Sequence, residues 1–539
     1  MLKNILIDRS RHKYTFIGTK SFVNLIKLFI LFVITGLCLG CNPTIASNRS
    51  GQIQTEGSPH QLEQTQDLAI SATQEIFEPE KRGQTVSQET VSPNLATLDE
   101  IMPTVAVGQL KQETRAIWAR VGRQPLRGRN GQIGPQDIDE LVAKVDAAHL
   151  NVILLAVYSG NVYFEPSHTR FSDEERLPSA ADPAFAKAGY PDALSYLISI
   201  RDERLADNDQ FNDFEVHAWF NINVGGRKEV VNGDYIDLRT EGMLNTIFPE
   251  FRLISGEYYT TNADEAYIDH EKSVLQQPRF RAYMTDLIAG VVEDYHVDGV
   301  HLDHIRTGGI CFNDEPLDYD GTEYDYPGCQ KDYEAWTLAT RGRQHTLWDD
   351  TDGHRDIQDG GSGRVAAWQE RNVELLVKSI HDEVKSVDPT TVISVASVRN
   401  DVSGLTALQQ RDGQSAWKWL NEGLIDAVFM TAYTPDTESI VDKMQTFRNA
   451  IQDPQKKLLV FPGLATYDLD DKDIPWSGKI MEQSEALLLS HWSAGQPLEP
   501  PTRGIGWFLF RMLTEKDAET LASGPYAEPA VPFWGGEEQ

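Results

Sequence analysis

The sequence has few basic residues for its size. Its 539 residues contain 49 Lys and Arg against 81 Asp and Glu, which gives a formal net charge of −32 at pH 7. A protein that binds nucleic acid needs a basic face that neutralises phosphates and releases counterions. The charge balance therefore argues against a nucleic-acid partner.

Cysteine is also scarce. The chain has four cysteines, and Cys38 and Cys41 lie close to the amino terminus, which leaves Cys311 and Cys329. A zinc site needs further ligands at short spacing, and the sequence offers none beside this pair. In an exported protein, a disulfide that closes the loop between the two is chemically permitted. We favour it over two free thiols, the remaining alternative.

The amino-terminal region has no apolar run long enough to span a bilayer. Its first 27 residues are basic, and a mostly apolar run of 13 residues follows from Leu28 to Gly40. A membrane-spanning helix needs about 20 apolar residues. A basic segment followed by a short apolar run that ends in small residues is typical of an export signal.

Residues 37–41, Leu-Cys-Leu-Gly-Cys, resemble a bacterial lipobox. In a lipobox the cysteine after a small residue is lipidated and becomes the new amino terminus, so Cys41 is the candidate lipidation site. The motif usually has leucine where this chain has Cys38. An ordinary signal peptide and an uncleaved anchor helix are the alternatives, and all three place the rest of the chain outside the cytoplasm. We expect a lipoprotein of the periplasm or cell surface, held to a membrane by its lipid anchor.

The segments that flank the folded part differ from it in composition. Residues 42–112 are rich in Ser, Thr, Gln, Glu and Pro and contain few aromatic residues, so burial cannot offset the entropy of ordering them. We interpret residues 1–41 as the export signal with its lipobox and residues 42–112 as a disordered linker. Residues 524–539 are rich in Pro and Gly, and we expect a loosely docked tail.

Between residues 113 and 523, short β-branched runs alternate with longer amphipathic runs. Strands that alternate with helices favour parallel βαβ units, and eight such units in one series favour a closed barrel. The predicted strands cover residues 115–119, 152–157, 215–221, 299–305, 392–397, 427–432, 458–462 and 504–510. The predicted helices cover residues 135–149, 191–204, 278–295, 364–387, 415–422, 437–451, 477–494 and 514–521.

We therefore predict an α/β fold, a (β/α)8 TIM barrel with long loop insertions after the second, third and fourth strands. An open doubly wound sheet is the alternative. No Gly-x-Gly-x-x-Gly or Walker-type loop follows a predicted strand, so a nucleotide-binding version loses its main support, and no cofactor is expected. The Asp-rich stretch at residues 349–359 lacks the spacing and the closing Glu of a Ca²⁺ loop, so no metal is expected.

Asp303 is the strongest catalytic candidate, because the loops after barrel strands build the mouth where chemistry takes place. Side chains alternate along a strand, so His301 and Asp303 share one face, with Asp303 nearer the mouth. Bulky apolar neighbours would favour the protonated form of the carboxyl, which suits a general acid. A structural Asp303 paired with Arg306 or His304 is the alternative.

Other residues near strand ends are candidates for binding substrate. Trp219 shares a strand face with two hydrogen-bonding residues, which together suit the apolar face and hydroxyl rim of a sugar. Trp219 and Tyr433 could instead be packing residues, and His301 a hydrogen-bonded core histidine. Arg306 could bind a substrate carboxylate or hold Asp303 ionised. The candidates are His217, Trp219, Asn221, His301, Arg306 and Tyr433.

Three strings of residues carry a resemblance to a known family. They are Glu-Val-His-Ala-Trp-Phe-Asn at residues 215–221, Val-Asp-Gly-Val-His-Leu-Asp at residues 297–303 and Trp-Gln-Glu-Arg-Asn-Val at residues 368–373. In order and spacing they resemble motifs of glycosyl-hydrolase-like family 10, barrel proteins of bacterial envelopes that are often lipoproteins. The resemblance implies hydrolysis of a glycan, and some relatives act on peptidoglycan glycan strands. His304 stands where the family commonly has a second acid, which leaves Asp303 as the residue to carry over.

A glycosidase usually needs two carboxylates about 5 to 10 Å apart. Asp436 is the second candidate closest to its strand end, and Glu165, Glu257 and Asp401 are the others. Attack by an N-acetyl group of the substrate, oriented by Tyr433, is the alternative route. We expect an envelope-anchored glycoside hydrolase that cleaves a bacterial polysaccharide such as peptidoglycan, with Asp303 as general acid. The alternative is a non-catalytic glycan-binding lipoprotein on a degenerate barrel.

Overall fold

The structure is a computed structural model. The predicted export signal, the lipidation site Cys41 and nearly all of the 42–112 linker lie outside the residues that it describes, as does the Asp-rich stretch at 349–359. The described residues are 110–120, 134–207, 213–223, 228–231, 234–237, 244–248, 251–255, 267–307, 311, 328–347, 363–397, 413–465, 479–489 and 492–535.

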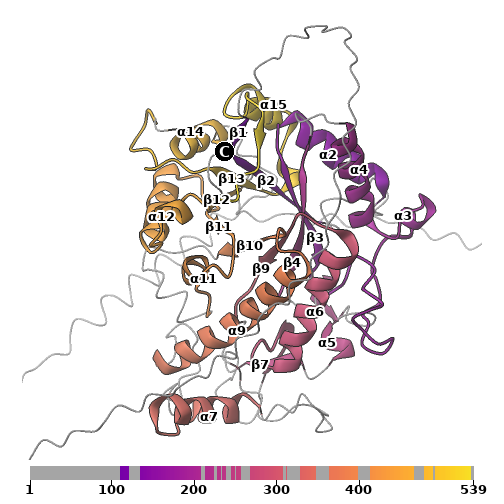
Figure 1. The fold of residues 1–539 in the computed structure, drawn as a ribbon, viewed down its shortest axis with the longest axis vertical. Coiled ribbons are helices and arrows are strands. Elements are labelled where there is room, and N and C mark those ends of the chain that lie inside the picture. The colour runs from indigo at the N-terminus through magenta and orange to yellow at the C-terminus, as the bar shows by residue number, and fades with distance from the viewer. Residues whose placement is uncertain are drawn as a thin grey trace, which may run out of the picture. The chain divides into compact units, whose positions relative to one another are not determined.

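Eight parallel strands form a closed barrel, which confirms the predicted fold (Figure 1). Each barrel strand pairs with the next one along the chain, and the last pairs with the first. The strands are β2 Thr114–Arg120, β3 Val152–Tyr158, β4 Glu215–Asn221, β9 Gly299–Asp303, β10 Val392–Ser397, β11 Ala427–Thr431, β12 Val460–Ala465 and β13 Gly504–Phe508.

A helix follows each barrel strand, and Figure 1 shows these helices arranged around the strands. Pro135 occupies the first turn of its helix, whereas Pro191 lies just before one. Within the described ranges, none of the helices is long and apolar enough to cross a membrane. The helices are α2 Pro135–Ala147, α4 Ala193–Asp207, α6 Pro278–Tyr295, α9 Gly363–Val387, α11 Ala416–Glu422, α12 Thr437–Asn449, α14 Ile480–Leu488 and α15 Glu515–Ser523, with the short α13 Pro454–Lys457 and the 3-10 helix η4 Phe510–Met512 between them.

Two glycines make room for an indole ring inside the barrel. A Cβ atom on Gly506 would lie 2.5 Å from the ring of Trp118, and one on Gly463 would lie 3.2 Å from it. Trp118 itself is almost completely buried. The barrel interior is therefore a packed core and not a pore.

Long insertions follow β3, β4 and β9, as the sequence predicts. The first contains α3 Pro183–Lys187, and the third contains α7 Cys329–Arg341. The structure contains the disulfide between Cys311 and Cys329, with Cα atoms 5.9 Å apart, at the start of α7. The second insertion contains the antiparallel pair β5 Lys228–Val231 and β6 Asp234–Asp237, the helix α5 Leu244–Ile247 and the antiparallel pair β7 Arg252–Ser255 and β8 Tyr267–Ser273.

The carboxyl-terminal segment packs against the barrel, which corrects the expectation of a loosely docked tail. Its strand β14 Ala530–Val531 pairs in parallel with β1 Lys111–Gln112. Tyr526 is fully buried, and the Thr114 hydroxyl donates a hydrogen bond of 2.9 Å to the carbonyl of Phe533. The Pro and Gly content suggested a loose tail, but the aromatic residues between them cover the amino-terminal end of the barrel.

Candidate functional site

A layer of bulky side chains fills the barrel below its mouth. The Trp118 ring lies edge-on to the rings of His301 and Phe429, with centroids 5.5 and 5.3 Å away. These three residues come from β2, β9 and β11. Because side chains alternate along a strand, the residues two positions further along point to the same side, one layer nearer the mouth. Those residues are Arg120, Asp303 and Thr431.

Asp303 is the last residue of β9 and the only carboxylate among the eight barrel-strand ends. It lies opposite Asn221, the last residue of β4, in the parallel register of the two strands. About a fifth of its side chain is exposed. Oδ1 accepts a hydrogen bond of 2.7 Å from the backbone N–H of His304, a residue with a φ of 51°. The left-handed backbone at His304 ends the strand here, and not at Ile305 as predicted.

The pKa of Asp303 is lowered from its usual value, against our expectation. Burial is the largest single influence, and it disfavours the charged form. The positive charges of His304 and Arg306, with the hydrogen bond from the His304 backbone, outweigh burial. The carboxyl is therefore ionised at neutral pH, which does not suit a general acid in the free protein.

His301 is a core histidine and not a substrate contact, which corrects its assignment. It is fully buried, and both ring nitrogens are engaged by protein groups. The Trp118 Nε1–H donates to Nε2 at 3.1 Å, and Nδ1 lies 2.9 Å from the Ser394 hydroxyl. Burial is the main reason that the pKa of His301 falls to about 3, so the ring is neutral at ordinary pH.

His217 lies at the opposite end of the barrel from the mouth, which corrects its assignment as a substrate-binding residue. It is fully buried and level with Gly299, the first residue of β9. Its Nε2 lies 3.0 Å from a carboxylate oxygen of Glu215, and its ring packs against Trp534 with centroids 5.1 Å apart. Alternation gives the face of a strand correctly, but it does not give the depth in the barrel.

Trp219 is also fully buried, so it is not an exposed platform for a sugar. The Arg120 guanidinium lies over its ring, with Cζ 5.3 Å from the centroid. The indole Nε1 of Trp219 and the amide oxygen of Asn221 are buried and have no hydrogen-bond partner within the described part of the chain. Buried polar atoms usually have partners, so these two atoms have hydrogen-bonding capacity that the described residues do not use.

The aromatic platform at the mouth consists of Tyr433 and Phe508. The two rings are stacked, with centroids 5.0 Å apart and an angle of 23° between their planes. Both side chains are partly exposed. Tyr433 was predicted, but Phe508 and Arg120 were missed. Phe508 lies inside a predicted strand whose alternation places it on the inner face, and this signal could have identified it.

Arg306 follows the strand end, and its guanidinium lies 3.3 Å from Nδ1 of His304. It also contributes to the lowered pKa of Asp303. It therefore favours the ionised form of Asp303, together with His304.

Asp436 is the N-cap residue of α12, which corrects its assignment as the second catalytic carboxylate. Its side chain is exposed and accepts a hydrogen bond of 3.4 Å from the backbone N–H of Ser439. Glu165 is also exposed. Glu257 and Asp401 lie outside the described residues. Within the described ranges, no group of three or more His, Cys, Asp or Glu side chains could hold a metal ion.

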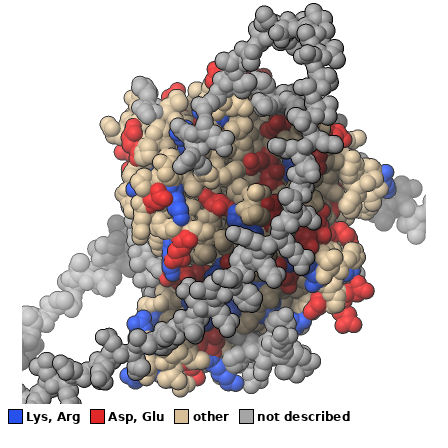
Figure 2. All heavy atoms as spheres, in the orientation of Figure 1, with Lys and Arg blue, Asp and Glu red and all other residues tan. Residues whose placement is uncertain are grey.

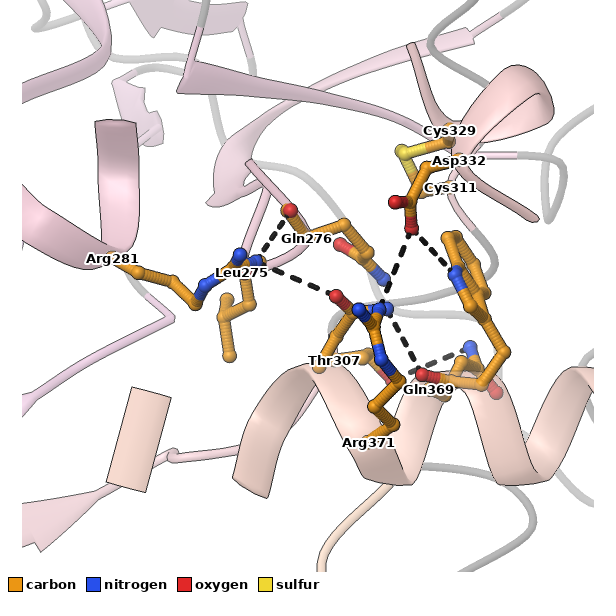
Figure 3. Close-up of a disulfide and its surroundings, with 11 residues drawn as sticks. Leu275, Gln276, Arg281, Thr307, Cys311, Cys329, Asp332, Gln369 and Arg371 are labelled. Carbon is orange, nitrogen blue, oxygen red and sulfur yellow. Dashed lines mark hydrogen bonds and ion pairs between the residues drawn. A yellow bond between two sulfur atoms is a disulfide. The ribbon is translucent and has the colours of Figure 1, made fainter. Parts of the chain in front are cut away.

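The insertion after β9 is joined to α9 beside the disulfide (Figure 3). The Trp368 indole donates a hydrogen bond of 2.7 Å to Asp332, which lies in α7 three residues after the disulfide cysteine Cys329. The Gln369 amide donates to the Thr307 hydroxyl at 3.5 Å. The string at residues 368–373 therefore connects the disulfide region to the segment that follows Asp303.

Comparison with known proteins gives one family. The sequence model described as glycosyl hydrolase-like 10 matches residues 113–477. None of the curated proteins matches the chain.

Three solved structures are similar to this chain at low sequence identity. The glycoside hydrolase domain of PgaB (BpsB) from Bordetella bronchiseptica is 14% identical with a TM-score of 0.46, over 76% of this chain and 98% of that one. Gan42B, a β-galactosidase from G. stearothermophilus, is 10% identical with a TM-score of 0.46, over 78% and 57%. The α-L-fucosidase isoenzyme 2 from Paenibacillus thiaminolyticus is 10% identical with a TM-score of 0.43, over 77% and 49%.

Proposed function

The chain belongs to the glycosyl hydrolase-like 10 family, whose model covers most of its barrel, and from this premise we propose that it hydrolyses glycosidic bonds in a bacterial polysaccharide. The observation that carries the proposal is the position of Asp303. It is a partly exposed carboxylate at the same end of the barrel as a stacked pair of aromatic rings, and it lies opposite Asn221, whose buried amide oxygen has no partner within the described part of the chain.

In this proposal Asp303 acts in its ionised form. Glycoside hydrolysis passes through a transition state with positive charge at the anomeric carbon. A carboxylate that its surroundings keep ionised stabilises that charge, either directly, as a nucleophile, or by accepting a proton from water. The proton for the leaving oxygen then comes from a different group. This replaces the role of general acid that the sequence suggested for Asp303.

The Tyr433 and Phe508 rings supply the apolar contact in this proposal. A pyranose ring presents C–H groups on one face, and partly exposed aromatic rings at the mouth complement that face. The amide oxygen of Asn221 can accept a hydrogen bond from a sugar hydroxyl. The site would thus hold one sugar unit against the rings, with its hydroxyl rim toward polar groups.

We also propose an envelope location. The basic segment, the apolar run and Cys41 support export and lipidation, and a lipid anchor would hold the barrel close to envelope polysaccharides such as peptidoglycan. The polysaccharide and the membrane are therefore the two partners in the proposal.

A second candidate function is glycan binding without catalysis. One observation favours it: Asp303 has no second carboxylate beside it at the other seven strand ends, and Asp436 serves as a helix cap. A binding protein would keep the aromatic platform and would not need a proton donor.

The decisive experiment is to incubate the purified barrel with a panel of envelope glycans and to detect new reducing ends by mass spectrometry. Release of oligosaccharides by the parent and not by Asp303→Asn supports hydrolysis. Saturable binding of a glycan without any cleavage would favour the second function. If no glycan is bound or cleaved, both candidates fail.

A further inference from the structure

Arg120 places a positive charge at the mouth of the barrel. It ends β2, two residues after the inward-pointing Trp118, and it is exposed. Its guanidinium carbon lies 5.3 Å from the centroid of the Trp219 ring and 5.8 Å from that of Phe508. Contacts of this kind hold a guanidinium over aromatic faces. The second of these contacts places the guanidinium next to Phe508, one of the two rings of the aromatic platform.

Within the described ranges, no carboxylate forms an ion pair with Arg120. Arg170, Arg201 and Arg204 each lie within 4 Å of at least one carboxylate, whereas Arg120 forms no salt bridge within the described ranges. The next thirteen residues of the sequence, 121–133, contain no Asp or Glu. The side chains that lower the pKa of Asp303 are His304 and Arg306, so Arg120 does not serve that carboxylate.

An exposed cation at the mouth stands out against the charge of the whole protein. The chain carries a net charge of −32, and red acidic side chains cover more of the face in Figure 2 than blue basic ones. Such a molecule repels anionic polymers in general. A specific anionic ligand therefore needs a local cation, which a bidentate guanidinium can supply.

The surroundings of Arg120 fit a sugar and not a free inorganic anion. The Phe508 ring contacts both the guanidinium and the Tyr433 ring, so the platform and the cation are adjacent. The Trp219 indole N–H beneath the guanidinium is buried without a partner within the described part of the chain. A sugar stacked on the platform would bring its ring substituents toward these donors.

We propose that the site prefers sugar units that carry a carboxylate, and that Arg120 binds this carboxylate. The inference rests on the proposed function, because it takes this end of the barrel as the glycan site. A uronic acid and a muramic acid with a free lactyl group both present such a carboxylate. The chemistry at Arg120 is the same for both.

The test compares acidic glycans with neutral copies of themselves. Chemical reduction of the carboxyl groups to alcohols converts a polyuronate into a neutral polymer with the same linkages. The probes are a polyuronate oligosaccharide, a peptide-free glycan that contains muramic acid, and the carboxyl-reduced form of each. Binding is measured by calorimetry and cleavage by release of reducing ends, with the same preparations.

The parent should bind at least one of the two acidic glycans about 10 to 100-fold more tightly than its reduced form, the range expected for a charge-assisted hydrogen-bonded pair. Which of the two glycans binds identifies the source of the carboxylate. Arg120→Gln should abolish the preference, and Arg120→Lys, which keeps the charge but not the planar fork, should retain part of it.

Arg503→Gln is the matched control. Arg503 also lies over an aromatic ring, with its guanidinium carbon 5.8 Å from the centroid of Phe533, but it lies at the opposite end of the barrel. This variant should keep the preference of the parent. Equal affinity of the parent for the acidic and reduced glycans would overturn the inference, as would an Arg120→Gln variant that still discriminates between them.

The outcomes separate this inference from the proposed function. Cleavage of a neutral glycan without any preference for acidic ones would leave hydrolysis standing and remove the role of Arg120. Preferential binding of an acidic glycan without cleavage would keep the role of Arg120 and argue against hydrolysis.

Discussion

The Trp118 indole donates a hydrogen bond to Nε2 of His301, and this contact sets the tautomer of the histidine. An indole N–H can only donate, so Nε2 must accept and carries no proton. The proton of the neutral ring is then on Nδ1, which donates to the Ser394 hydroxyl. His301 is therefore a fixed, uncharged side chain in the layer directly below Asp303.

The first prediction concerns the pH dependence of stability. The pKa of His301 is about 3 in the folded protein, against about 6.5 in the unfolded chain. Between these values the unfolded chain binds a proton that the folded protein excludes, so stability decreases as the pH falls from 6.5 toward 3. The slope from this residue is about 1.4 kcal/mol per pH unit.

Urea unfolding of the parent and of His301→Gln between pH 4 and pH 7 measures this effect. The glutamine can still accept from Trp118 and donate to Ser394, but it does not titrate. The parent should lose stability more steeply than the variant as the pH falls. Parallel curves for the two proteins would contradict the burial of a neutral His301.

The second prediction concerns catalysis by Asp303. Asp303→Asn keeps the size of the side chain and the hydrogen bond from the His304 backbone, but it removes the charge. Turnover should fall about 10² to 10⁴-fold while glycan binding largely survives. Melting temperature and hydrolysis are measured on one preparation. Asp436→Asn is the matched control, because Asn caps a helix as well as Asp does and activity should not change.

The result would go against this role if a well-folded Asp303→Asn protein kept most of the parent's rate. A large loss of stability in the same variant would instead mark Asp303 as a structural partner of Arg306.

The third prediction separates an ionised role of Asp303 from an acid role. Since its pKa is lowered in the folded protein, the carboxylate form persists as the pH falls from 7 to 4. With an aryl glycoside, whose leaving group needs no proton, kcat/KM should therefore stay constant over this range and decrease only below it. A rate that instead decreases as the pH rises from 4 to 6 would show that the protonated carboxyl is the active form.

The fourth prediction concerns the packing of the barrel. A methyl group on Gly506 would lie 2.5 Å from the Trp118 ring, so Gly506→Ala should destabilise the fold by about 1 to 3 kcal/mol. Gly363→Ala is the control, because a Cβ there meets no atom within 4 Å. Chemical denaturation of both variants measures the difference. Equal stabilities would mean that the barrel core can make room for the methyl group.

The fifth prediction concerns anchoring. If Cys41 is lipidated, Cys41→Ser should release the protein from the membrane fraction or leave it unprocessed at the signal. Fractionation and gel mobility of the two proteins measure this. A variant that fractionates and migrates like the parent would rule out lipidation at Cys41.

The barrel could be predicted because its signal is repeated eight times along the chain. Most of the strands are short apolar runs, and most of the helices are long enough to show their own periodicity. Asp303 was found because alternation and position along the strand both apply to it. The same two rules exclude Asp298 as a catalytic candidate, because it precedes β9 and so lies at the other end of the barrel. There it accepts a hydrogen bond from the Arg201 guanidinium.

The parts that were missed depend on contacts between distant segments. Alternation places His217 on the inner face. The packing of Trp534 against its ring shows that it lies at the end of the barrel opposite the mouth. Arg120 was missed because the predicted strand stopped one residue before it. The lowered pKa of Asp303 depends on Arg306 and on the backbone turn at His304, and neither geometry can be derived from a local pattern.

The pairing of β1 with β14 determines where a fusion partner, a tag or a support can be attached to the barrel. The two strands bring residue 111 beside residue 530, at the end of the barrel remote from Asp303. A fusion partner, an affinity tag or a solid support joined near either strand would therefore be located behind the barrel. A long polymer could then still approach the mouth from the front, with both of its ends extending into solvent.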